Sequence, residues 1–210
     1  MKINDQITLG NYAGEPIEWQ VIAEAEGRVL LLSRKVLEIR PFHPVDESEK
    51  QNPAQGYYET DWKSCELRSW LNGEFAAAAF SQEELARIPS SSVTYNQIYK
   101  TLHSFFQGEK QTEDKIFLLS EVQLQKYLPN EADRAAILTD HAQAQLKACP
   151  HRAWGSWWLC ASVRYGYGAH CKYVNNCVRD GKFLGTTIGE TAVWAGDVGV
   201  RPAMWYQALD

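Results

Sequence analysis

The segment Trp157-Trp158-Leu159 and the closing string Gly199-Val200-Arg201-Pro202-Ala203-Met204-Trp205 say more about the scaffold of this chain than any other part of it. Paired tryptophans, followed by Gly-rich and aromatic sequence, predict a strand and then a long irregular excursion. Asp180-Gly181 predicts a hairpin turn, and Arg201-Pro202 predicts the beginning of a last strand. No catalytic or cofactor motif accompanies these residues, so they indicate a fold and no particular chemistry.

The same segments carry two structural expectations. Trp157 and Trp158 are neighbours on a strand, so their side chains point to opposite faces and must pack in different layers. Arg201 stands directly before Pro202, where a planar guanidinium can hold loop carbonyls or a carboxylate in a fixed geometry. We therefore expect Arg201 to be structural, and we expect Trp19, Trp70 and the last strand to be buried with the tryptophan pair.

The first forty residues predict antiparallel strands. Residues 17–22 alternate apolar and polar side chains before they end in two apolar positions, and Gly27 predicts a turn into the apolar run 28–33. Because the end of the chain also predicts a strand, the two ends are expected to meet in one sheet.

The middle of the chain predicts helices between loops. A helix over residues 61–71 carries one apolar stripe, and Asn72-Gly73 predicts its end. Two capping boxes, each with a serine followed three residues later by Glu or Gln, predict helix starts at Ser81 and Ser120. The other expectations here are a long surface loop over residues 40–61, a second long loop or insertion over 90–114, a buried strand over 115–119, and a helix over 130–147 that is interrupted near Thr139-Asp140.

The composition excludes some functions. The formal net charge of −5, from 21 basic and 26 acidic residues, argues against binding to nucleic acids or anionic membranes, since both need a basic surface. No run approaches the roughly 18 apolar residues of a membrane-spanning helix, and the beginning of the chain has no apolar signal segment. We expect a cytoplasmic protein without nucleic-acid or membrane partners.

The five cysteines occupy positions 65, 149, 160, 171 and 177, an odd number with irregular spacing. No Cys-x-x-Cys motif occurs. In a reducing compartment such residues act mostly as small apolar side chains with free thiols.

A series of short motifs occurs in a fixed order along the chain. The motifs are Ile17-Glu18-Trp19-Gln20-Val21, Leu30-Leu31-Leu32-Ser33, Trp62, Leu67-Arg68-x-Trp70-Leu71-Asn72, Phe80-Ser81-x-x-Glu84, Phe117-Leu118-Leu119-Ser120, Trp157-Trp158-Leu159, Val178-x-x-Gly181 and Gly199-Val200-Arg201-Pro202-Ala203. Together they resemble a bacterial family of unknown function, which is distantly similar to the formylglycine-generating sulfatase-modifying enzymes. The resemblance covers nearly the whole chain.

The resemblance implies an α+β fold that is similar to C-type lectins, with a twisted antiparallel sheet, two or more helices and long loops. We accordingly expect residues 1–210 to form one lectin-like domain. Many unrelated functions use variable loops on such a rigid sheet, so the fold assigns no function by itself. In the family the tryptophan strand usually continues with Arg-Ser-Pro-Gly; here it continues with Cys160-Ala161-Ser162-Val163, which removes a cation from this strand.

A cysteine-dependent, oxidase-like enzyme is the main alternative function. The formylglycine-generating enzymes use two cysteines near the C-terminal sheet, and Cys171 and Cys177 lie in the corresponding region; thiolates are suitable ligands for Cu(I). On one regular strand, however, these residues would be about 20 Å apart, and the sequence around them departs from the family's pattern. A zinc site that combines them with His170 lacks a fourth ligand at a diagnostic spacing. We predict no catalytic residue, no metal and no cofactor.

The candidate ligand-binding residues are the aromatic and charged side chains of the Gly-rich C-terminal segment: Arg164, Tyr165, Tyr167, His170, Trp194 and Asp197. Tyr, Trp and Arg make low-entropy contacts in recognition surfaces. The other interpretation is that these rings pack beneath the loops as a small second core. The sequence thus favours a non-catalytic module that recognises a carbohydrate or protein ligand through its C-terminal loops.

Overall fold

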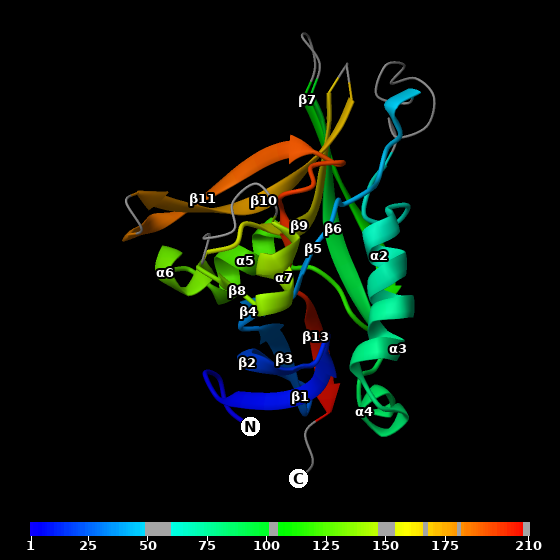
Figure 1. The fold of residues 1–210 in the computed structure, drawn as a ribbon. Helices are drawn as coiled ribbons and strands as arrows, with labels where there is room; N and C mark the ends of the chain where they lie inside the picture. The colour runs from blue at the N-terminus through cyan, green and yellow to red at the C-terminus, as the bar shows by residue number, and fades with distance from the viewer. Residues whose placement is uncertain (49–59, 101–104, 147–153, 166–167, 180–181, 208–210) are drawn as a thin grey trace.

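The computed structural model describes residues 1–48, 60–100, 105–146, 154–165, 168–179 and 182–207, and it contains three sheets with short helices around them (Figure 1). The strands are β1 (Gln6–Tyr12), β2 (Glu15–Ala25), β3 (Arg28–Ser33), β4 (Lys35–Val36), β5 (Glu38–Ile39), β6 (Ser91–Lys100), β7 (Phe105–Asp114), β8 (Ile137–Leu138), β9 (Trp157–Tyr165), β10 (Gly168–Arg179), β11 (Lys182–Ala192), β12 (Gly199–Val200) and β13 (Ala203–Gln207). The helices are α2 (Glu66–Trp70), the π-helical turn η3 (Leu71–Phe75), α3 (Ala76–Ala79), α4 (Gln82–Ala86), α5 (Glu121–Tyr127), α6 (Glu131–Arg134) and α7 (Asp140–Gln145). This mixture of sheets and helices is α+β, as predicted.

The smaller of the two large sheets joins both ends of the chain. Its order is β1-β2-β3-β13, and β13 pairs antiparallel with β3 (Figure 1). On β2, Ile17, Trp19 and Val21 are buried because they share one face of the strand. The predicted meander and the meeting of the two ends are confirmed.

The larger sheet has seven strands, in the order β11-β10-β9-β12-β5, with β6 paired to β9 and β7 paired to β6. The predicted hairpin near residue 180 is confirmed, since Arg179 pairs with Lys182 across the turn. The prediction of a long irregular excursion after the tryptophan pair is wrong, because β9 and β10 form an antiparallel pair from Trp157–Val174 to Tyr165–Gly168, with one register shift between Cys171 and Tyr173. β12 fits between β5 and β9 only because residue 199 is glycine: a Cβ there would lie 2.2 Å from a methyl carbon of Val36.

The prediction of a long loop or insertion over residues 90–114 is also wrong. β6 and β7 form a long antiparallel hairpin whose pairs run from Ser91–Asp114 to Lys100–Phe105. β6 buries Val93 and Tyr95 on one face, whereas most of β7 is exposed and polar. β7 is the outer strand of the pair, so its side chains need no apolar pattern.

The helix predicted to stop at Asn72-Gly73 continues through η3 and α3 to Ala79. Asn72 does not end it, because its side-chain oxygen accepts hydrogen bonds from the backbone N–H groups of Lys115 and Ile116. The strand predicted over residues 115–119 is wrong: the segment is buried from Ile116 on, but only Phe117 makes an isolated bridge, to Ala203.

Several local predictions are confirmed. Both capping boxes form, at Ser81 with Glu84 and at Ser120 with Gln123. The helix predicted over residues 130–147 forms only in part, as the short helices α6 and α7 with the strand β8 between them. Of the predicted surface loop over residues 40–61, the part from 49 to 59 lies outside the described residues. None of the helices in the described residues has the length and apolar composition of a membrane-spanning helix.

Trp157 and Trp158 are both fully buried, and they point into different layers, as predicted. The Trp157 indole donates to the Arg134 carbonyl at 3.0 Å, while the Trp158 indole donates to the Arg40 carbonyl at 2.9 Å. Each indole is therefore hydrogen-bonded to a different segment of the chain. Trp19, Trp70 and the residues from Val200 to Met204 are buried too, whereas Trp205 is half-buried and Gln207 is exposed.

Candidate functional site

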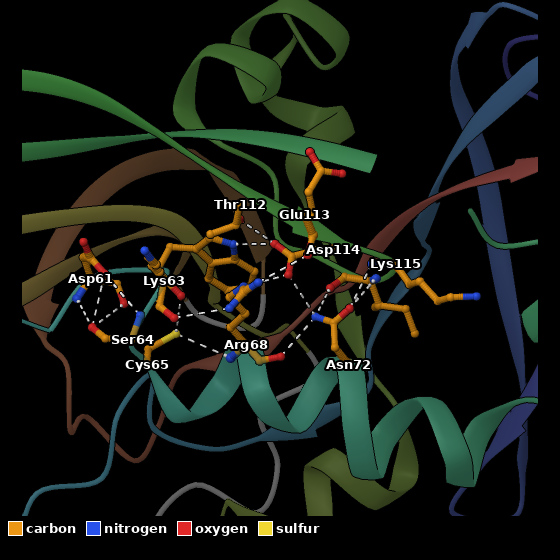
Figure 2. Close-up of polar contacts among 12 residues, drawn as sticks. Asp61, Lys63, Ser64, Cys65, Arg68, Asn72, Thr112, Glu113, Asp114 and Lys115 are labelled. Atoms are coloured by element: carbon orange, nitrogen blue, oxygen red, sulfur yellow. Dashed lines mark hydrogen bonds and ion pairs between the residues drawn. The ribbon is translucent and has the colours of Figure 1, made fainter. Parts of the chain in front are cut away.

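A buried carboxylate, Asp114, organises the polar groups beneath α2 (Figure 2). It accepts hydrogen bonds from Arg68 Nε at 2.6 Å, Thr112 Oγ1 at 2.6 Å, Trp62 Nε1 at 3.0 Å and Asn72 Nδ2 at 3.4 Å. The residue is only 2% exposed. Because every partner belongs to the protein and the carboxylate is closed off from solvent, this network holds α2 against β7 and offers no place for a ligand.

A second carboxylate, Asp61, lies at the other end of the same network. It accepts hydrogen bonds from Lys110 Nζ at 2.8 Å, from the Tyr95 hydroxyl at 3.1 Å and from the Ser64 backbone N–H at 3.2 Å. Desolvation acts to raise the pKa of Asp61, but the hydrogen bonds and the charge of Lys110, with Tyr95 and Ser64, outweigh it and lower the pKa. Asp61 is therefore ionised and stabilises the fold at neutral pH.

The lowered pKa of Asp61 predicts a pH dependence. A carboxyl group whose pKa is lower in the folded state contributes stability above its unfolded pKa of about 4, and that contribution is lost as the pH falls through the folded pKa. Urea unfolding between pH 7 and pH 2 should show a smaller loss of stability on acidification for Asp61→Asn than for the wild type. Equal slopes below about pH 4 would contradict this.

The thiols are poor candidates for chemistry. Cys65, Cys160 and Cys171 are fully buried, and desolvation raises the pKa of each thiol. The Cys171 thiol donates to the Leu159 carbonyl at 3.0 Å. Cys177, which lies further along β10, is half-buried and faces Thr187. A raised pKa removes the thiolate that a nucleophile or metal ligand requires, and no cluster of three metal-binding side chains occurs among the described residues.

The predicted ligand-binding residues are divided between two faces of the larger sheet. Arg164 lies over the Tyr99 ring, 5.3 Å from its centroid, on one face. Tyr165, the next residue of β9, points to the other face, where its hydroxyl donates to Glu190. Arg164 and Tyr165 therefore cannot belong to one binding surface.

Tyr165 is held in place by a charged pair. Lys100 Nζ lies 2.9 Å from a carboxylate oxygen of Glu190 and 5.4 Å from the centre of the Tyr165 ring. The bond to Glu190 raises the pKa of Lys100. Desolvation opposes ionisation of Glu190, but Tyr165 and Lys100 outweigh it and lower the pKa of its carboxyl. Desolvation, and then Glu190, raise the pKa of Tyr165. All three side chains thus keep their neutral-pH charge states.

Two further residues complete this face. The His170 ring packs edge-on against Tyr165, with centroids 4.9 Å apart. Phe105 of β7 pairs with Lys100, which in turn pairs with Tyr165, so the three share one row across the sheet. Phe105 is 65% exposed. We refer to Lys100, Phe105, Tyr165, His170 and Glu190 as the outer sheet surface.

The other predicted residues lie elsewhere. Trp194 is half-buried and packs against the main core, and Asp197 is exposed in the turn before β12. Tyr167 lies outside the described residues. The sequence analysis missed Lys100 and Phe105 because they lie in the segment interpreted as a loop; the alternation of apolar and polar residues in β6 was the signal that could have found them.

The comparisons with known proteins concern the family. Residues 26–208 match the model of a family described as a domain of unknown function (DUF6273). This match covers more than half of the chain, so the chain belongs to that family, in agreement with the expected membership of a family of unknown function. No curated protein and no solved structure matches the chain significantly.

Proposed function

We propose that this protein is a non-catalytic recognition module, and that it binds a carbohydrate or protein ligand through the outer sheet surface. The scaffold proposed for it is a single C-type-lectin-like domain, distantly related to the formylglycine-generating enzymes. The observation that carries the proposal is the row of Phe105, Lys100 and Tyr165, in which Lys100 lies between an exposed ring and a ring that the Lys100–Glu190 ion pair holds in place. Aromatic side chains held in one position are the residues that dominate recognition energies.

The rival function, a cysteine-dependent oxidase, gains no support from the geometry. Three thiols are closed off from solvent with raised pKa values. Cys171 and Cys177 are positions on the same strand, paired with Thr191 and Gly185, so they are separated along β10 as expected from the sequence. A recognition role needs none of these groups to react.

The proposal is tested with Tyr165→Ala. Labelled wild-type protein applied to a glycan array and to a phage-displayed peptide library should retain a defined set of ligands. The substitution should weaken that binding by about tenfold or more, as for an aromatic contact residue. Because Tyr165 is only half-buried, the free energy of unfolding should fall by about 1–2 kcal/mol, less than the roughly 3–5 kcal/mol expected for a core ring.

Tyr173→Ala is the matched control. Tyr173 is also half-buried, but its ring packs against Trp158, with centroids 6.2 Å apart, away from the outer sheet surface. It should lose stability and keep its ligands. If no glycan or peptide is retained, or if Tyr165→Ala binds like the wild type, the proposed function is wrong. A cytoplasmic location and the lack of nucleic-acid or membrane partners remain predictions.

A further inference from the structure

A cleft of about 250 Å³ opens between β6 and α5. Ser92, Thr94 and Asn96 line one wall; they alternate along β6, so they share one face of the strand. By the same alternation Lys100 lies on this face further along β6, although it does not line the cleft. Gln123 and Tyr127 of α5 form part of the opposite wall.

Asn96 is the feature of this cleft that indicates a ligand. The residue is 6% exposed, and its side chain lines the cleft. Among the described residues, no group hydrogen-bonds its side-chain amide, although the amide could donate two bonds and accept two. Its amide atoms are not among the buried polar atoms that are cut off from solvent, so water reaches the amide through the cleft, and a ligand there can replace that water.

The opposite wall offers a complementary donor. The side-chain oxygen of Gln123 accepts the backbone N–H of Ser120 at 2.9 Å, which fixes this side chain in the capping box. Its NH₂ group is left to donate. Val122, 58% exposed, and the half-buried Tyr127 ring add apolar surface beside these polar groups.

The size and charge of the cleft restrict its occupant. Its volume is below the roughly 300–1,000 Å³ that is typical of sites for drug-sized molecules, so the ligand is small. Glu109 and Lys126 stand on opposite walls with opposite charges, so neither an anion nor a cation is favoured. An apolar ligand would leave the Asn96 amide unsatisfied.

We propose that this cleft binds a neutral polyhydroxyl ligand on the scale of a single sugar ring, through the Asn96 amide, the Gln123 NH₂ and the hydroxyl of Thr94. Each sugar hydroxyl both donates and accepts, which matches a wall that presents an amide and hydroxyl groups. The apolar C–H groups of the ring then face Val122 and Tyr127. This site is separate from the outer sheet surface, and it does not depend on the proposed function.

The experiment is a titration of the ¹⁵N-labelled full chain with glucose, galactose, mannose and N-acetylglucosamine, each up to about 50 mM, followed by amide chemical shifts. At least one sugar should shift the resonances of β6 and α5, with a dissociation constant on the order of 1 mM. Asn96→Leu, which has a similar shape without polar atoms, should weaken this binding about tenfold, the loss of roughly one hydrogen bond. Its melting temperature should change little, because the substitution removes no hydrogen bond within the described residues.

Asn176→Leu is the control, since Asn176 is also 6% exposed and its NH₂ group donates to the Gly155 carbonyl, although its side-chain oxygen has no partner. It should lower the melting temperature by about 5 °C and leave sugar affinity unchanged. Thr94→Val provides a second, nearly isosteric test of the same wall and should also weaken binding. The proposal is overturned if no sugar shifts these resonances, if Asn96→Leu binds as the wild type does, or if glycine and glutamate bind there instead of sugars. Because Tyr165→Ala should leave this titration unchanged, failure here is distinguishable from failure of the proposed function.

Discussion

Replacing Asp114 by alanine should lower the free energy of unfolding by about 3–5 kcal/mol, the usual effect of removing one partner from a buried, charged network. The substitution leaves the guanidinium of Arg68, a residue of α2, without its carboxylate, although the guanidinium keeps weaker bonds to two backbone carbonyls. It also leaves the buried Trp62 indole N–H without an acceptor. Both losses occur in one place, so the effects on α2 and β7 add to each other.

Urea unfolding at neutral pH measures this effect, and Glu113→Ala is the matched control. Glu113 precedes Asp114 on β7, but its side chain is exposed, so its loss should change stability by no more than about 0.5 kcal/mol. Asp114→Asn keeps an acceptor and should fall between the two. A loss below about 1 kcal/mol for Asp114→Ala would show that the network does not hold α2 in place.

Arg201→Met should lower the free energy of unfolding by about 2–4 kcal/mol. Arg201 is 2% exposed; its Nε donates to the Ser33 carbonyl at 2.8 Å, and its Nη1 donates to the Arg134 carbonyl at 3.1 Å. Its guanidinium also lies over the Trp157 ring, 5.0 Å from the centroid. Burial lowers the pKa of Arg201. Methionine fills similar space, but it leaves the Ser33 carbonyl unsatisfied.

Arg201→Lys should be compared with Arg201→Met, because an ammonium cannot donate along the two directions of a planar guanidinium. It should therefore recover little of the lost stability. Arg34→Met is the control: Arg34 is a partly exposed residue that pairs with Glu18 at 3.2 Å, and a surface pair contributes about 0–1 kcal/mol. If Arg201→Met and Arg34→Met unfold at the same urea concentration, Arg201 is not the structural residue that its burial indicates.

The candidate site was only partly accessible to sequence reasoning. Tyr165 and His170 were predicted and do lie together. Arg164 was grouped with them because it is adjacent in the chain, yet adjacency on a strand places it on the opposite face. Glu190 and Lys100 could not be paired with Tyr165 from the sequence, since the contact joins β6, β9 and β11, which are far apart along the chain.

The same limit applies to Asn96. It lies in a segment rich in Ser, Thr and Gln that was interpreted as a loop, and nothing local distinguishes an amide that lines a cleft from one in solvent. Its importance arises only when α5 is placed over β6. Similarly, Asn72-Gly73 is a sound local signal for a helix end, but the hydrogen bonds from Asn72 to the segment at Lys115 and Ile116 override it.

The sequence by itself determined the features that depend on neighbours within a few residues: the capping boxes at Ser81 and Ser120, the meander of β1 to β3, and the opposite directions of Trp157 and Trp158. These follow from backbone geometry and hydrophobic periodicity, which act locally. Only the tertiary structure decided the parallel pairing of β6 with β9 and the face on which each polar side chain lies. Such pairings are fixed by the burial of whole faces against distant segments, and no local pattern specifies which segment that is.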